Sequence, residues 1–81
     1  MWMSNLYIMV NSKNSDRNSL HDLCEAVTHA GATVIHVDEH AHLIEAAIPS
    51  HETSTVAAME GVSYVRSSFN YFAPAELLRA A

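Results

Sequence analysis

The chain of 81 residues repeats one pattern twice: an extended stretch, a helical stretch and a second extended stretch. In the first half, Leu6–Val10 is a continuous apolar run of strand length. Residues 19–31 follow with helical spacing, and Thr33–Val37 is then β-branched and strand-like. A chain of this length forms one domain, so both halves contribute to a single core.

The first helical stretch has an apolar face and recognisable ends. Ser19 is a candidate N-cap, with Asp22 three residues later as a weaker form of a capping box. Gly31 suits the position after the helix, where a left-handed backbone costs glycine little. The apolar positions follow the i, i+3, i+4, i+7 spacing of a helix and are Leu20, Leu23, Cys24 and Val27.

The second half begins with a hairpin. Asp38–Ala41 is a short polar turn, and Leu43–Ile48 is the strand that closes the hairpin before Pro49 stops it. Alternation along that strand directs three residues inward: Ile44, Ala46 and Ile48.

A second, shorter helix and a final strand complete the pattern. The helix starts at Ser50 and ends at Gly61, and Val62–Phe69 is the last strand, with Val65 inward. The residues expected on the buried side of the helix are Thr53, Val56, Ala57 and Met59.

The order strand, helix, strand, strand, helix, strand predicts an α+β, ferredoxin-like βαββαβ sandwich. It has a four-stranded antiparallel sheet with two helices on one face. We expect the domain to cover residues 1–73. Residues 74–81 form a C-terminal tail in which Pro74 suits the first position of a short helix.

With both helices on one side, the other sheet face is left for solvent, for a second subunit or for a partner. Two aromatic side chains and a methionine on it could form an exposed apolar patch, and an ordinary solvated face is the alternative. The candidate partner-binding residues there are Tyr7, Met9, His36, Glu45, Tyr64 and Arg66.

Composition excludes several function classes. The net charge is −5 and the four cationic residues are scattered, so nothing resembles a basic surface for nucleic acid. The sequence contains no run of about 18 apolar residues, the length that would predict a membrane span. The N-terminus lacks the pattern of a signal peptide. Cys24 is the single cysteine, so no internal disulfide can form. A cytoplasmic location is the resulting expectation.

Motifs for catalysis are absent, so we expect neither an enzyme nor a cofactor. No G-x-S-x-G elbow or phosphate-binding glycine loop occurs. Cys24 lies on an apolar helix face without an adjacent base, which favours a structural thiol. A metal site at His36, His40 and His42 is the alternative to exposed hairpin histidines, but the expected turn separates these side chains.

The pattern from Leu6–Asn11 to Val62–Ser67 resembles the propeptide domain of subtilisin-type serine proteases, the inhibitor I9 family. The twin-arginine chaperones of nitrate reductase maturation share the plan, usually with a longer second helix. The resemblance is clearest from Gly31 onward. The residues that carry it are Gly31-Ala32-Thr33-Val34, the strand Val34–Val37, Ala46-Ala47-Ile48 and Val62-Ser63-Tyr64-Val65.

The resemblance implies a protein-binding module. Members of that family lay the open sheet face on two surface helices of the protease and insert the chain after the last strand into the active-site cleft. Free-standing members are protease inhibitors or relatives of intramolecular chaperones. By position, the residues entering the cleft would be Tyr71, Phe72, Ala73 and Pro74. This chain departs from the pattern because Pro74 falls near the family's end and the sequence continues to Ala81.

Two alternatives stay open. The aromatic residues of the tail could instead pack back on the domain. The chain could also be a dimeric ferredoxin-like domain that binds a small molecule or a metal, with Tyr7, Met9 and Tyr64 buried between subunits. An enzyme like the small dimeric ferredoxin-like monooxygenases would need a deep pocket that the sequence does not indicate.

Overall fold

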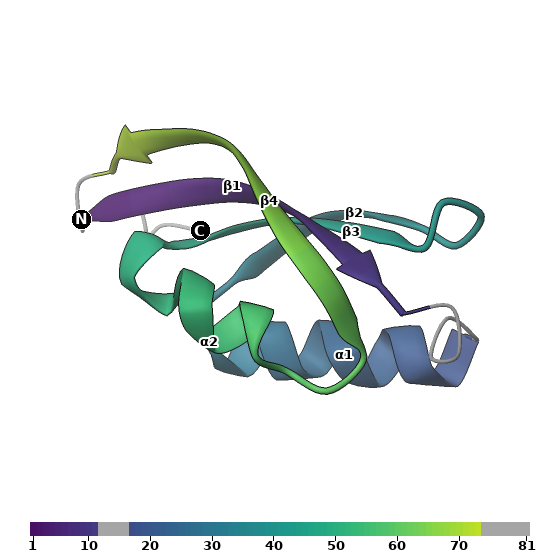
Figure 1. Ribbon diagram of the computed structural model, residues 1–81. Coiled ribbons are helices and arrows are strands. Elements are labelled where there is room, and N and C mark those ends of the chain that lie inside the picture. Colours follow the sequence, from purple (N-terminus) through teal and green to yellow (C-terminus); the bar gives the residue numbers. More distant parts are fainter. Residues whose placement is uncertain (12–16, 74–81) are drawn as a thin grey trace.

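The computed structural model describes residues 1–11 and 17–73 and confirms the α+β, ferredoxin-like fold (Figure 1). The sheet has the strand order β2-β3-β1-β4, and each neighbouring pair is antiparallel. The elements are β1 Trp2–Val10, α1 Arg17–His29, β2 Thr33–Asp38, β3 Leu43–Pro49, the 3-10 turn η2 Ser50–Glu52, α2 Thr53–Ala57 and β4 Val62–Phe72.

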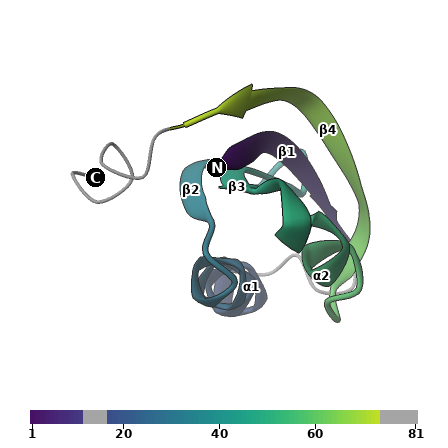
Figure 2. The ribbon, with the colours of Figure 1, turned by 90° about the vertical axis from the view of Figure 1, so that its left-hand side faces the viewer.

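Both helices pack on one face of the sheet, as predicted. Figure 2 shows α1 and α2 beneath the strands, while neither of these two helices lies over the opposite face. The inward positions predicted for β3 are confirmed, because Ile44, Ala46 and Ile48 are all fully buried. The largest fully buried side chains are Leu6, Ile8, Val27, Ile44, Ile48 and Val56.

The helix α1 buries the predicted apolar stripe. Leu20, Leu23 and Val27 belong to the core, and Cys24 packs against it half-buried. The prediction of Ser19 as N-cap is wrong, since the helix begins at Arg17 and Ser19 lies within it. Residue spacing predicts the buried face of a helix more accurately than it predicts the residue at which the helix begins. No helix in the described part of the chain is long and apolar enough to cross a membrane.

Gly31 has the backbone conformation expected after a helix, with φ of +98°. A Cβ at this position would lie 3.6 Å from the Pro49 ring, an ordinary contact distance. The left-handed backbone, rather than lack of space, is therefore the reason for glycine here.

The hairpin between β2 and β3 turns at residues 39–42, one residue later than predicted, because Asp38 still pairs with Leu43. The Asp38 carboxylate accepts a hydrogen bond of 3.0 Å from the Ala41 backbone N–H inside the turn. Bonding to this N–H lowers the pKa of Asp38, so the carboxylate stays charged as an acceptor. His42 closes the turn with φ of 54°.

The second helix differs from its prediction. Ser50–Glu52 forms a 3-10 turn, and only Thr53–Ala57 is α-helical. Val56 is fully buried, whereas Ala57, also expected on the buried side, is exposed. A helix of five residues has little more than one turn, so it directs only one side chain into the core, and that side chain is Val56.

The strands β1 and β4 are longer than predicted. The strand β1 starts at Trp2 rather than Leu6, and β4 ends at Phe72 rather than Phe69. The added residues pair with each other, and the buried Ser4 hydroxyl bonds Asn70 and Ser50 at 2.7 Å each. These long-range bonds offset the low strand propensity of serine and asparagine. The predicted tail helix over residues 74–81 lies outside the described residues.

Candidate functional site

The sheet face opposite the helices, here called the open face, contains all six residues predicted on it. Residues that are paired across neighbouring strands point to the same side of the sheet, so the strand registers show which residues belong to the open face. Tyr7 pairs with Glu45 on one side and Arg66 on the other, Met9 pairs with Tyr64, and His36 pairs with Glu45. The complete set of open-face residues is Met3, Asn5, Tyr7 and Met9 of β1; Thr33, His36 and Asp38 of β2; Leu43, Glu45, Ala47 and Pro49 of β3; and Tyr64, Arg66, Phe69 and Tyr71 of β4.

Aromatic side chains gather on the β4 side of the open face. Tyr64 and Phe69 are each 55% exposed, and the rings of Phe69 and Tyr71 lie 5.8 Å apart. Tyr7 and Met9 beside them are half-buried. Solvent-exposed aromatic rings on an uncovered sheet face are typical of a surface that contacts another molecule.

Sequence reasoning missed Phe69 as an open-face residue. The register shifts between Asn5 and Leu6, so their β4 partners are Phe69 and Ser67, with Ser68 as the extra residue. A bulge of this kind changes which side chains share a face, placing Phe69 and Tyr71 with Tyr64 and Arg66. No residue type in the sequence marks the position of the bulge.

Charges are distributed unequally across the open face. Glu45 lies on β3, where its carboxylate accepts a 3.2 Å hydrogen bond from the Asn5 amide, and Asp38 lies on β2. Arg66, on β4, is the one Lys or Arg whose side chain is described. One half of the open face is therefore acidic and the other half cationic.

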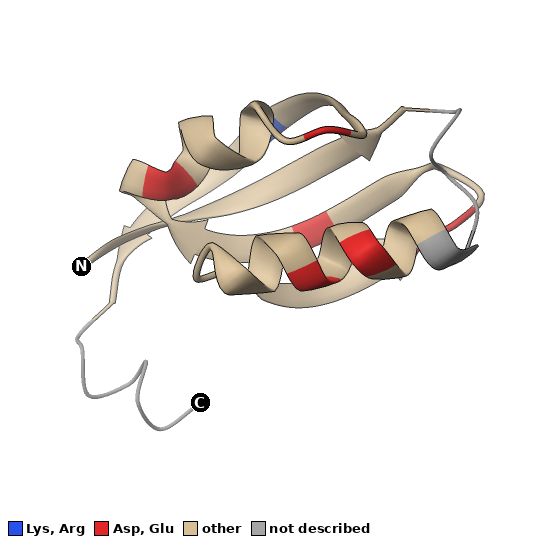
Figure 3. Ribbon diagram, turned by 90° about the horizontal axis from the view of Figure 1, so that it is seen from below, with Lys and Arg blue, Asp and Glu red and all other residues tan. Residues whose placement is uncertain are grey.

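The helix side is acidic throughout its described part. Figure 3, viewed from that side, shows Asp and Glu on α1, ahead of α2 and in the turn before β4. These residues are Asp22, Glu25, Glu52 and Glu60. A second molecule carrying the same charges would be repelled by this side more than by the open face.

The aromatic tail is part of the sheet. Tyr71 and Phe72 belong to β4 and pair with Met3 and Trp2, so the prediction that they follow the last strand is wrong. Ala73 exchanges backbone hydrogen bonds with Met1. Phe72 contacts Trp2 with ring centroids 5.7 Å apart, and both lie on the helix side of the sheet by register, about 60% exposed. Pro74 lies outside the described residues.

The histidines of the hairpin are not grouped as metal ligands in the described part of the structure. Within residues 1–11 and 17–73, no three His, Cys, Asp or Glu side chains are placed to hold a metal ion. His36 lies on the open face beside Glu45, whereas His40 and His42 lie in the turn. The hairpin turn therefore begins between His36 and His40 along the chain.

Cys24 is half-buried on α1, and burial raises the pKa of its thiol. A raised pKa leaves less of the nucleophilic thiolate at any given pH. No ion pair or hydrogen bond to the thiol is recorded in the described part of the structure, so nothing there activates it.

Alkylation of Cys24 is therefore expected to be several-fold slower in the native chain than in the urea-unfolded chain at the same mildly alkaline pH. Iodoacetamide labelling followed by mass spectrometry measures both rates, with free cysteine in the same buffers as control. Native labelling as fast as labelling of the unfolded chain would contradict a protected thiol.

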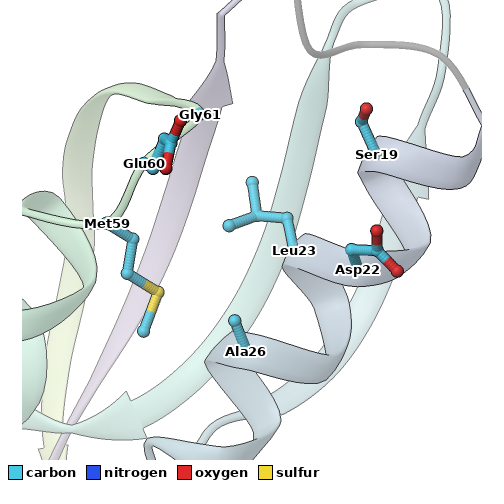
Figure 4. Close-up of a pocket in the computed structure, with 7 residues that line it drawn as sticks. All are labelled: Ser19, Asp22, Leu23, Ala26, Met59, Glu60 and Gly61. Carbon is cyan, nitrogen blue, oxygen red and sulfur yellow. The ribbon is translucent and has the colours of Figure 1, made fainter.

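A cavity of about 390 Å³ lies between α1 and the turn that leads into β4 (Figure 4). Leu23 and Met59 extend toward each other across it, above Ala26, and Asp22 and Glu60 stand at its sides. Its volume is at the lower end for small-molecule sites. None of the residues predicted from the sequence as binding residues lines it.

Comparison with family models, with curated proteins and with solved structures finds no match for this chain. The resemblance to subtilisin propeptides therefore stays a prediction from the sequence.

Proposed function

We propose that the protein is a small non-enzymatic module that binds another protein through its open face. The observation that carries this proposal is the group of aromatic side chains on the sheet face that α1 and α2 leave uncovered, with Tyr64 and Phe69 more than half exposed. Aromatic residues are the side chains most often found to dominate binding energy in protein interfaces.

A subtilisin-like protease is the partner class that the sequence resemblance implies. Two surfaces could make that contact, the open face and the segment around Phe72. Phe69 and Phe72 lie on the same strand but on opposite faces, which makes them a matched pair for deciding between the surfaces. Their exposed fractions are similar, 55% and 62%.

Phe69→Ala is expected to weaken inhibition of subtilisin by roughly tenfold or more, the usual effect of removing a central aromatic contact. Phe72→Ala is expected to stay close to the unchanged chain if the open face is the contact. The measurement is the inhibition constant of the full chain and of each variant. Circular dichroism checks that each variant is folded.

Ile35→Ala is the control variant, because Ile35 is also 55% exposed and has no partner in the register between β2 and β3. A loss confined to Phe72→Ala would assign binding to the end of β4. Negligible inhibition by the unchanged chain would remove the protease from consideration.

A further inference from the structure

We propose that the partner on the open face is a second copy of this chain, packed face to face about a two-fold axis that runs along β1. This inference rests on the proposed function, since it names the occupant of the same surface. It is based on the register of β1 with its two neighbours and on the charges that the register places on either side.

The strand β1 lies between β3 and β4, so each open-face residue of β1 has one neighbour on each side. Each open-face residue of β1 and its partners on β3 and β4 form one row across the sheet. Rotation by 180° about an axis parallel to β1 leaves the position of each row along the strand unchanged and exchanges the β3 side with the β4 side. Each β3 residue of one copy then lies against the β4 residue of the same row in the other copy. Such an interface is isologous, with each contact occurring twice.

The central row becomes complementary in charge. It consists of Glu45, Tyr7 and Arg66 in register. Across the axis, Tyr7 meets the same residue of the second copy, and Arg66 meets Glu45 of the second copy. Both ion pairs form together, and Arg66 has no ion-pair partner among the described residues of its own chain.

The other rows become complementary in shape. Met9 lies between Leu43 and Tyr64, Asn5 between Ala47 and Phe69, and Met3 between Pro49 and Tyr71. In every row a large aromatic ring of β4 therefore faces a smaller apolar residue of β3 in the second copy. Sheets packed face to face interdigitate their side chains in this way across about 10 Å.

Charge on the rest of the molecule favours this face. The helix side carries Asp22, Glu25, Glu52 and Glu60 and no described cation, so two helix sides would repel each other. The acidic and cationic halves of the open face instead attract each other once one copy is turned about β1.

Sedimentation equilibrium of the full chain tests the proposal. We expect a monomer–dimer equilibrium within the micromolar range. Arg66→Glu and Glu45→Arg each turn both ion pairs into like charges, so each is expected to weaken the dimer roughly a hundredfold. Glu45→Arg also makes the net charge less negative, so general charge repulsion predicts the opposite change.

An equimolar mixture of the two variants tests directly whether Arg66 of one copy pairs with Glu45 of the other. A chain with Arg66→Glu has two acidic positions, and one with Glu45→Arg has two cationic positions. Their heterodimer recovers both pairs, so the equimolar mixture is expected to dimerise like the unchanged chain. One control is expected to change nothing: Glu25→Arg, which makes the same change of charge on the exposed surface of α1, away from the open face.

A monomer at every concentration would overturn the second-copy proposal. A dimer that persists in both variants, or a mixture that fails to recover, would overturn the axis along β1. Protein binding is judged separately: a monomeric chain whose inhibition of subtilisin is lost with Phe69→Ala would retain the proposed function with a different partner. Circular dichroism of each variant shows that a lost dimer does not result from unfolding.

Discussion

Ile44→Ala is expected to lower the free energy of unfolding by about 2–5 kcal/mol, the usual cost of emptying a buried isoleucine site. Ile44 is fully buried on β3, and it pairs with Ile8 of β1 and Val37 of β2. A domain of this length has about 4–12 kcal/mol of stability in total. The substitution is therefore expected to leave the domain marginally folded.

Urea unfolding followed by circular dichroism measures this change. Leu43→Ala is the matched control. Leu43 is the residue before Ile44 on β3, but its side chain points to the open face and is only half-buried. It is expected to cost less than half as much as Ile44→Ala, because less apolar area is removed from water on folding. The protein must be diluted, since self-association would add to the apparent stability. Equal losses at the two positions would contradict the assignment of faces in β3.

Val56→Asp is expected to unfold the domain or to remove about 3–5 kcal/mol of its stability. Val56 is fully buried and is the one buried residue of α2. A carboxylate there would lose its hydration without an opposite charge nearby. A helix of five residues is not stable by itself, so its position depends on tertiary contacts, and Val56 is the side chain that it buries in the core.

Ala57→Asp is the control on the next residue, and thermal unfolding compares the two variants. Ala57 is exposed, so its replacement is expected to change stability by about 0.5 kcal/mol or less. The helical spacing in the sequence placed both residues on the buried side. A large loss for Ala57→Asp would support that original assignment and contradict the structure.

Periodicity predicted the faces of the longer elements correctly. In β3, alternation assigned Ile44, Ala46 and Ile48 to the core, and all three are fully buried. In α1, the stripe of Leu20, Leu23 and Val27 was equally reliable. Both assignments succeed because side-chain direction follows from backbone geometry alone, with a period of two in a strand and of 3.6 in a helix.

Part of the candidate site also follows from the alternation of side chains along the strands. Tyr7, Met9 and Tyr64 were assigned to the open face by alternation, and the register brings them together. Phe69 was missed, and Tyr71 was assigned to the tail instead. Their place on the open face depends on the bulge at Ser68 and on β4 continuing to Phe72, which local sequence does not specify.

The order of the elements and the side of each that faces the core follow from apolar spacing, because this spacing is a local property of the chain. The residues at which β1 begins and β4 ends could not be predicted in this way, because they depend on hydrogen bonds between residues 66 and 72 positions apart in the chain. Ser4 bonds Asn70, and Met1 bonds Ala73. The pairing of these distant segments extends the open face to Tyr71 and holds the supposed tail within the sheet.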